Sequence, residues 1–176
     1  GPFTGSVNAS MLKKAGAEFI ILGHSENRSE GETNHLIKKK IKSALNEKLN
    51  IIFCIGETFK EKKRGKTFSI LKKQIRNSLE KKFNIKRIIF AYEPVWSIGT
   101  NKIPKMQDLK NTIKFIKSEF KKTFKTEKSP KVLYGGSVND KNIGLFSSIS
   151  EIDGFLIGGA SQSSKKFIDI VKNCYK

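Results

Sequence analysis

Five short apolar runs, each closed by a glycine or a polar cluster, constrain the fold of this 176-residue chain more than any other feature. The runs occupy residues 19–22, 51–55, 88–92, 132–134 and 155–157. They are continuous rather than alternating in polarity, which is typical of strands whose two faces are both buried in a parallel sheet. We therefore expect five parallel strands.

The segments between these runs have the periodicity of amphipathic helices. In two of them apolar residues recur at helical spacing, at Phe68, Leu71, Ile75, Leu79 and Phe83, and at Leu109, Ile113, Ile116, Phe120 and Phe124. Strands that alternate with amphipathic helices form repeated βα units. No linker or low-complexity tract divides the chain. Residues 1–176 are therefore expected to form a single α/β domain with a parallel sheet.

The charge of the chain raises the question of a nucleic-acid partner. There are 35 basic and 16 acidic residues, a formal charge of +19. The arginines are few, at Arg28, Arg64, Arg76 and Arg87, whereas phosphate and base recognition usually relies on the bidentate guanidinium. The lysines are spread over all the expected helices. This favours a solvated lysine-rich surface, and a basic nucleic-acid-binding module remains the alternative.

Other classes of protein find little support in the composition. No apolar run reaches the roughly 18 residues of a membrane-spanning helix, and the first residues show no signal-peptide pattern, so a cytoplasmic protein is expected. Cys54 and Cys174 are too far apart for a metal knuckle, and Cys54 lies inside an apolar run, as a small buried hydrophobe does. His24 and His35 are the only histidines, so no metal site is expected.

Glycine-rich turns follow the last two apolar runs, at residues 135–137 and 158–159. In parallel α/β folds the loops after the carboxyl ends of the strands form the active-site face. Successive backbone N–H groups in such a turn can hold an oxyanion. Either turn alone is more simply an ordinary βα turn. Two on consecutive strands, one of them with a serine hydroxyl, favour a phosphate site.

Two titratable side chains also follow expected strands. Glu93 stands at the end of the run 88–92, where a shielded carboxylate can act as a general base; a loop ion pair is the alternative. His24 follows the run 19–22 at what is expected to be the start of a helical turn. The positive end of a helix dipole disfavours imidazolium there, and a structural hydrogen-bonding histidine is the alternative.

Five segments, taken together, resemble the triosephosphate isomerase family. They are GPFTGSVNASMLKKAGAEFIILGHSENR, FCIGET, AYEPVWSIGTNK, VLYGGSV and GFLIGGAS, in the order that the family has. The resemblance implies a (β/α)₈ TIM barrel that forms a homodimer. It also implies the interconversion of dihydroxyacetone phosphate and glyceraldehyde 3-phosphate in glycolysis and gluconeogenesis, without a metal or an organic cofactor.

The resemblance also assigns roles to single residues. It implies that Glu93 is the base and His24 the neutral electrophile, a pair for which this family is itself the established example. Glu26 resembles a supporting carboxylate beside them, and Thr4 a dimer contact. The groups that bind the substrate phosphate correspond to Gly99, Ser137, Gly158 and Gly159. The closing lid corresponds to Pro94, Val95, Trp96, Ile98, Thr100 and Lys102, and Asn101 stands where the family usually has glycine.

One part of the family pattern finds no match in the chain. The family's first strand ends in an asparagine and a lysine, and nothing here corresponds to that segment. The resemblance therefore implies that the five runs are the fourth to eighth strands, that is, a partial barrel without the first three βα units. The alternatives are another phosphate-binding barrel, such as an aldolase or a phosphosugar epimerase, and an inactive barrel remnant.

Overall fold

The computed structural model describes residues 2, 4–100 and 102–174. Five parallel strands form one sheet in the order β1-β2-β3-β4-β5, as the apolar runs predict. The strands are β1 (Phe19–Leu22), β2 (Asn50–Ile55), β3 (Ile88–Tyr92), β4 (Val132–Tyr134) and β5 (Gly154–Phe155). Because every strand neighbours the next in sequence, all five carboxyl ends lie along one edge of the sheet.

The predicted fifth strand, residues 155–157, is wrong in its placement. In the structure Gly154 pairs with Leu133 and Phe155 with Tyr134. The N–H of Leu156 still donates to the Tyr134 carbonyl at 3.0 Å, but β4 ends at Tyr134. The chain beyond Leu156 therefore has no partner strand there, and the ladder rather than the apolar run sets the end of β5.

The expectation of strands buried on both faces is confirmed for β2 to β4 and wrong for β1 and β5. β2 and β3 are mostly buried and β4 alternates between buried and half-buried residues, whereas β5 is only half-buried. In β1, Phe19 is 50% and Ile21 is 49% exposed. Both β1 and β5 are edge strands among the described residues, so one side of each has no neighbouring strand.

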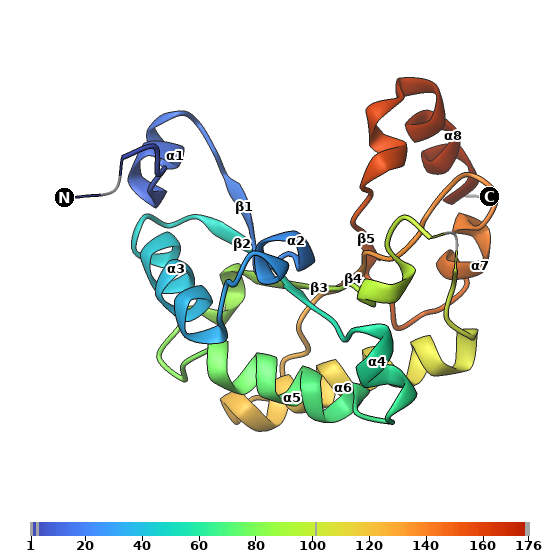
Figure 1. Ribbon diagram of the computed structural model, residues 1–176, viewed down its shortest axis with the longest axis horizontal. Helices are drawn as coiled ribbons and strands as arrows, with labels where there is room; N and C mark the ends of the chain where they lie inside the picture. The colour runs from blue at the N-terminus through green and yellow to red at the C-terminus, as the bar shows by residue number, and fades with distance from the viewer. Residues whose placement is uncertain (1, 3, 101, 175–176) are drawn as a thin grey trace.

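Helices connect the strands as the periodicity predicts. The α-helices are α1 (Ala9–Lys14), α2 (Ser25–Ser29), α3 (Asn34–Asn46), α4 (Phe59–Lys63), α5 (Thr67–Ser78), α6 (Met106–Phe124), α7 (Ile143–Ser147) and α8 (Ser164–Cys174). Three short 3₁₀ turns are η1 (Ile85–Arg87), η2 (Val95–Ser97) and η3 (Gly159–Gln162). Figure 1 shows α5 and α6 side by side beneath the strands, with α1 and α8 rising at opposite ends.

The longer helical pattern is confirmed in full and the shorter one only in part. α6 spans the whole pattern from Leu109 to Phe124. α5 ends at Ser78, because Leu79 takes an extended conformation with φ −115° and ψ 150°. Phe83 therefore lies beyond the helix, although it is still buried and packs against the core.

Aromatic rings join the sheet to its outer helices. The ring of Phe90 on β3 lies 5.6 Å from that of Phe53 on β2 and meets Phe120 on α6 edge to face at 5.7 Å. Such pairs add to the free energy of burial because the ring edges are electropositive and the faces electronegative. The core therefore lies between the sheet and its helices.

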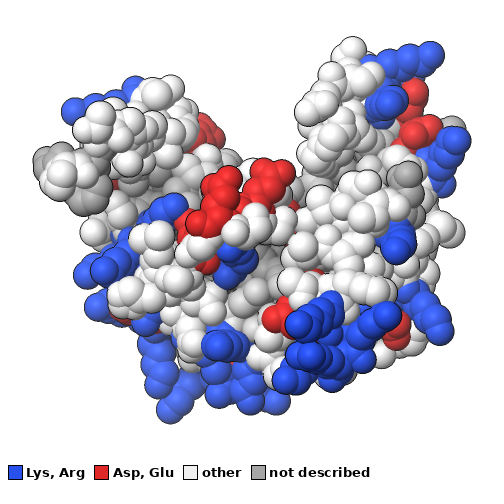
Figure 2. Space-filling model, in the orientation of Figure 1, with Lys and Arg blue, Asp and Glu red and all other residues white. Residues whose placement is uncertain are grey.

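The surface carries the charge in a dispersed form. Figure 2 shows lysine and arginine side chains over several helices, and a hollow between the two rising ends of the molecule. No single basic patch dominates this view, in keeping with the expectation of a solvated lysine-rich surface. Within the described residues, no helix is both long and apolar enough to cross a membrane.

Candidate active site

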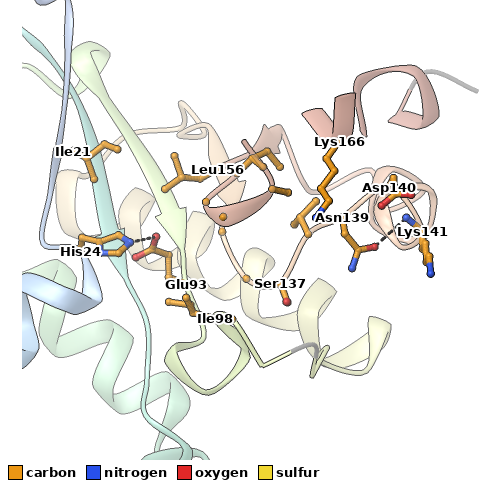
Figure 3. A pocket seen from close by; sticks show the side chains of 18 residues that line it. Ile21, His24, Glu93, Ile98, Ser137, Asn139, Asp140, Lys141, Leu156 and Lys166 are labelled. Atoms are coloured by element: carbon orange, nitrogen blue, oxygen red, sulfur yellow. Dashed lines mark hydrogen bonds and ion pairs between the residues drawn. The ribbon is translucent and has the colours of Figure 1, made fainter. Parts of the chain in front are cut away.

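A cavity of about 740 Å³ opens at the carboxyl ends of the strands, where the sequence predicts the active site. Figure 3 shows His24 and Glu93 at one side of it and Lys166 at the other, with Ser137 between them. The cavity brings together six of the seven predicted catalytic and phosphate-binding residues: His24, Glu93, Gly99, Ser137, Gly158 and Gly159. These come from loops far apart in the sequence, so the sheet is what assembles them.

Glu93 directly follows β3, and its side chain is only 4% exposed. Its backbone N–H donates to the Ile55 carbonyl at 2.8 Å, which extends the β2–β3 ladder by one residue. Burial raises the pKa of the Glu93 carboxyl above its ordinary value. A carboxylate with a raised pKa is a stronger base than an exposed one.

Two glycines leave the space that Glu93 needs. A Cβ on Gly56 would lie 1.7 Å from the Glu93 carbonyl oxygen, and a Cβ on Gly135 would lie 2.9 Å from Glu93 Cγ. The side-chain amide of Gln74 binds both the N–H and the carbonyl of Gly56, each at 2.9 Å. The glycines after β2 and β4 are therefore required by the close approach of the strand between them.

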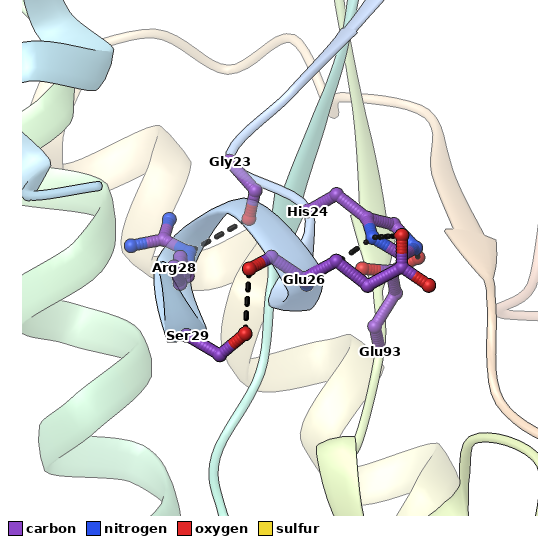
Figure 4. A network of polar contacts seen from close by, with 6 residues as sticks. All are labelled: Gly23, His24, Glu26, Arg28, Ser29 and Glu93. Carbon is purple, nitrogen blue, oxygen red and sulfur yellow. Dashed lines mark hydrogen bonds and ion pairs between the residues drawn. The ribbon is translucent and has the colours of Figure 1, made fainter. Parts of the chain in front are cut away.

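His24 is the N-cap of α2, which confirms that it begins a helical turn. Its Nδ1 accepts a hydrogen bond from the Glu26 backbone N–H at 3.4 Å. A nitrogen that accepts carries no hydrogen, so the hydrogen of this ring is on Nε2. Nε2 lies 3.3 Å from Glu93 Oε1 (Figure 4). The imidazole N–H and the carboxylate therefore face each other at one side of the cavity.

Arg28 holds the turn that carries His24. Its Nε donates to the Gly23 carbonyl at 2.7 Å (Figure 4). Its Nη2 donates to the Cys54 carbonyl at 3.2 Å. The Glu26 side chain, by contrast, is 85% exposed, and its carboxylate lies 3.8 Å from His24 Nδ1, beyond hydrogen-bonding distance. Glu26 stands beside the cavity and does not line it.

The far half of the cavity is built from the two glycine turns. Gly158 is the N-cap of η3, and Ser137 lies in the turn after β4. Lys141 and Lys166, both largely exposed, contribute positive charge to the same cavity. Backbone N–H groups of successive loop residues, together with nearby cations, favour an anionic ligand. This half therefore suits an anion, while the opposite half holds the carboxylate and the imidazole.

Glu57 anchors the first part of the predicted lid. Its side chain accepts a hydrogen bond from Trp96 Nε1 at 2.9 Å, and its carbonyl accepts one from the Val95 N–H at 3.1 Å. Glu57 is 1% exposed, and burial raises the pKa of its carboxyl, while hydrogen bonds from Trp96 and Tyr92 oppose part of the rise. On the face of the indole, Lys62 Nζ of α4 lies 3.6 Å from the ring centre.

The later part of the predicted lid reaches the cavity. Ile98 and Gly99 both line it. Gly99 has φ +65°, a conformation that glycine adopts without strain. The Thr100 hydroxyl donates to the Trp96 carbonyl at 2.9 Å and accepts from the Lys102 N–H at 3.2 Å, both within the lid. Asn101 lies outside the described residues.

Sequence reasoning missed residues that support the site. Glu57 follows β2 in a glycine and polar cluster, so the strand-end argument that selects Glu93 also selects Glu57. Arg28 is one of the few arginines, and the sequence gives no sign that it supports the site. Its bonds to Gly23 and Cys54 depend on the packing of β1 against β2.

This arrangement defines a class of protein. A buried carboxylate faces an imidazole N–H at the carboxyl ends of parallel strands, with anion-suited turns beside them, as in the acid–base enzymes of the (β/α) barrel class. The family model for triosephosphate isomerase matches residues 1–174. The chain belongs to the triosephosphate isomerase family.

Individual relatives agree with this assignment. The chain is 42% identical to the triosephosphate isomerase of Thermodesulfovibrio yellowstonii, over 98% of this chain and 71% of that protein. It is 46% identical to that of Dictyoglomus thermophilum, over 98% of this chain and 72% of that protein. The crystal structure of the Bartonella henselae triosephosphate isomerase superposes with a TM-score of 0.90 at 35% identity, covering 100% of this chain and 72% of that one. The sheet is thus part of a TIM barrel.

Proposed function

We propose that this protein interconverts dihydroxyacetone phosphate and glyceraldehyde 3-phosphate, with Glu93 as the base and His24 as the electrophile. The observation that carries the proposal is the pair itself: His24 Nε2 lies 3.3 Å from Glu93 Oε1, at the side of a cavity whose other side is built of glycine turns. A substrate with a phosphate at one end and a carbonyl near the other fits both halves.

The chemistry follows from the two side chains. The Glu93 carboxylate takes a proton from the carbon next to the substrate carbonyl, and the His24 Nε2–H donates a hydrogen bond to the carbonyl oxygen, where negative charge develops. The electron pair of the broken C–H bond forms the double bond of an enediolate. The hydroxyl oxygen of the neighbouring carbon gives its proton to the former carbonyl oxygen, with the His24 ring as the carrier in this proposal. Return of the first proton to the neighbouring carbon then completes the isomerisation, and no electrons leave the substrate.

The anion-suited turns take the phosphate in this proposal. The backbone N–H groups of Gly99, Ser137, Gly158 and Gly159 bind its oxygens, and the Ser137 hydroxyl adds a further donor. The support is that all four residues line one cavity with Glu93. A fixed phosphate also orients the reacting carbons, which replaces a random encounter by a positioned one.

The lid and the assembly extend the proposal. Residues 94–100 and Lys102 close over the bound substrate and exclude water, which protects the enediolate from side reactions. We also propose a homodimer in which Thr4, an exposed residue of the turn before α1, contacts the partner subunit. The proposed setting is glycolysis and gluconeogenesis in the cytoplasm.

The experiment is a comparison of the full natural protein with its Glu93→Gln and Glu93→Asp variants in an isomerisation assay. Loss of a general base lowers rates by about 10²–10⁴-fold, so we expect kcat of Glu93→Gln to fall within that range. Glu127→Gln is the matched control, because Glu127 is exposed, lies after α6 and does not line the cavity. Isomerisation by Glu93→Gln at the wild-type rate would show that another group is the base.

A further inference from the structure

The hydroxyl of Ser97, in the lid, joins three segments of the chain. Ser97 is 0% exposed. Its Oγ donates to the Lys102 carbonyl at 2.5 Å and accepts from the Ser137 N–H at 3.3 Å. The Tyr134 hydroxyl lies 3.3 Å away as a third partner. One buried oxygen therefore connects the middle of the lid with its last residue, with the end of β4 and with the turn after it.

The hydrogens available to these groups determine the direction of each bond. A serine hydroxyl has one hydrogen to donate and two lone pairs that accept. The Lys102 carbonyl can only accept and the Ser137 N–H can only donate, so Ser97 gives its hydrogen to Lys102. The Tyr134 hydroxyl must then donate to Ser97. With one bond donated and two accepted, the Ser97 hydroxyl is fully used.

The surroundings of Ser97 are closely fitted to this arrangement. A Cβ on Gly136 would lie 2.2 Å from Tyr134 Oη and 2.9 Å from Ser97 Oγ, so only glycine fits the turn. Burial raises the pKa of Tyr134 to about 12. The phenol therefore keeps its hydrogen at neutral pH and remains a donor to Ser97.

The Ser137 N–H has a single hydrogen, and two acceptors need it. In the structure Ser97 Oγ holds it at 3.3 Å, beyond the usual range of N–H···O distances. A phosphate oxygen is charged, and it accepts a shorter and stronger hydrogen bond than a neutral hydroxyl does. A phosphate at this turn therefore competes with Ser97 for the same donor and takes it.

We propose that Ser97 is a positioning residue that couples the lid to the anion site through the Ser137 N–H. Its hydroxyl holds that N–H while the site is empty and releases it when a phosphate binds. The middle of the lid is then free of the turn, while Lys102 and Tyr134 still hold Ser97. This inference rests on the proposed function, because it takes the Ser137 turn as the place of the substrate phosphate.

The test measures the binding of inorganic phosphate to the full natural protein and to its Ser97→Ala variant. Phosphate is titrated while the Ser137 amide signal is followed by NMR in ¹⁵N-labelled protein. Ser97→Ala removes the competing acceptor, so we expect the Kd for phosphate to fall about 2- to 10-fold, the equivalent of one neutral hydrogen bond. We expect kcat to fall as well, because the lid loses the bond from Ser97 to Lys102. Tighter phosphate binding with slower turnover is a combination that general loosening of the fold does not produce.

A matched control separates competition from lid loosening. Thr100→Val removes another lid hydroxyl, whose acceptors are the carbonyls of Trp96 and Ser97, both within the lid. We expect its Kd for phosphate to stay within about twofold of wild type, whatever its kcat, because the Ser137 N–H keeps its partner. If Ser97→Ala does not fold, Ser97→Cys serves instead, since sulfur is a weak acceptor of similar size.

Three outcomes would overturn the inference, and they are distinguishable. Equal or weaker phosphate binding by Ser97→Ala, with a clear response of the wild-type Ser137 amide, overturns the role of Ser97 and leaves the phosphate site standing. No response of that amide in the wild type overturns the proposed phosphate site and the inference with it. Equally tightened binding in Thr100→Val assigns the effect to lid loosening and not to Ser97.

Discussion

Replacement of Gly56 by alanine tests how strongly the position of Glu93 depends on the bare backbone of the neighbouring strand. The added Cβ would lie 1.7 Å from the Glu93 carbonyl oxygen and 2.6 Å from its carbonyl carbon, and both are main-chain atoms. Real Cβ atoms essentially never approach another atom within 3.0 Å, so the end of β3 must move by at least about 1.3 Å. No side-chain rotation relieves this contact.

The size of the effect follows from the bonds beside the clash. The Glu93 N–H donates to the Ile55 carbonyl at 2.8 Å, and the Val95 N–H donates to the Glu57 carbonyl at 3.1 Å. Loss of both costs about 1–3 kcal/mol, and strain from overpacking adds about 1–3 kcal/mol. We expect the free energy of unfolding to fall by about 2–6 kcal/mol. If Glu93 is the base that we propose, a displacement of about 1 Å at this group also lowers kcat by about 100-fold.

Urea unfolding followed by fluorescence of Trp96, the only tryptophan, measures the first quantity, and an isomerisation assay measures the second. Gly144→Ala is the control, because its Cβ meets nothing within 4 Å and alanine favours the helix. Its free energy of unfolding is expected to rise by up to about 1 kcal/mol. A Gly56→Ala variant within about 1 kcal/mol of wild type, with more than about a tenth of its kcat, would refute the reasoning.

Two further predictions concern the anchor of the lid. Lys62→Met keeps the apolar part of the side chain but removes the ammonium from the face of Trp96, so acrylamide should quench Trp96 fluorescence more strongly. Lys60→Met, on the same helix, should leave the quenching unchanged. Equal quenching in the two variants would contradict the contact between Lys62 and Trp96. Burial raises the pKa of Glu57 above the ordinary 4.5, so the folded chain holds this proton more tightly than the unfolded chain. That contribution to stability is complete below the ordinary value and is lost as the pH rises through the raised value. Urea unfolding measured from about pH 5 to about pH 8 should therefore show a smaller decline in the free energy of unfolding for Glu57→Gln than for wild type. Glu93, whose pKa is also raised, contributes the same decline to both proteins. Parallel curves of the free energy against pH would contradict the raised pKa of Glu57.

The fold is predictable from the sequence to the extent that burial leaves a local pattern. The runs that became β2 to β4 are apolar because their side chains are mostly buried against the core, and the boundaries of β1 to β4 are correct within one residue. The run 155–157 misplaced β5, because the end of a strand depends on its hydrogen-bonded neighbour, here Tyr134. The helical pattern wrongly placed Phe83 in a helix, because a residue outside a helix can pack into the same core.

The site is predictable to the extent that residues follow strands. Glu93 and His24 could be placed at one edge because parallel strands share a direction, and the structure brings them within 3.3 Å. The bond from Trp96 to Glu57 links residues 39 apart in sequence, and no periodicity encodes a contact of that kind. Glu26 shows the converse: a family motif places it near His24, but its own side chain points to solvent.

The sequence by itself determined the alternation of strand and helix, the parallel sheet, and the set of polar residues at the strand ends. These follow from local hydrophobic periodicity and from the turn chemistry of glycine, which act over a few residues. Only the tertiary structure decided which side chains share a proton or a hydrogen bond. Ser97 and Ser137 are 40 residues apart, and they meet because the packing of β3 against β4 brings the ends of the two strands together.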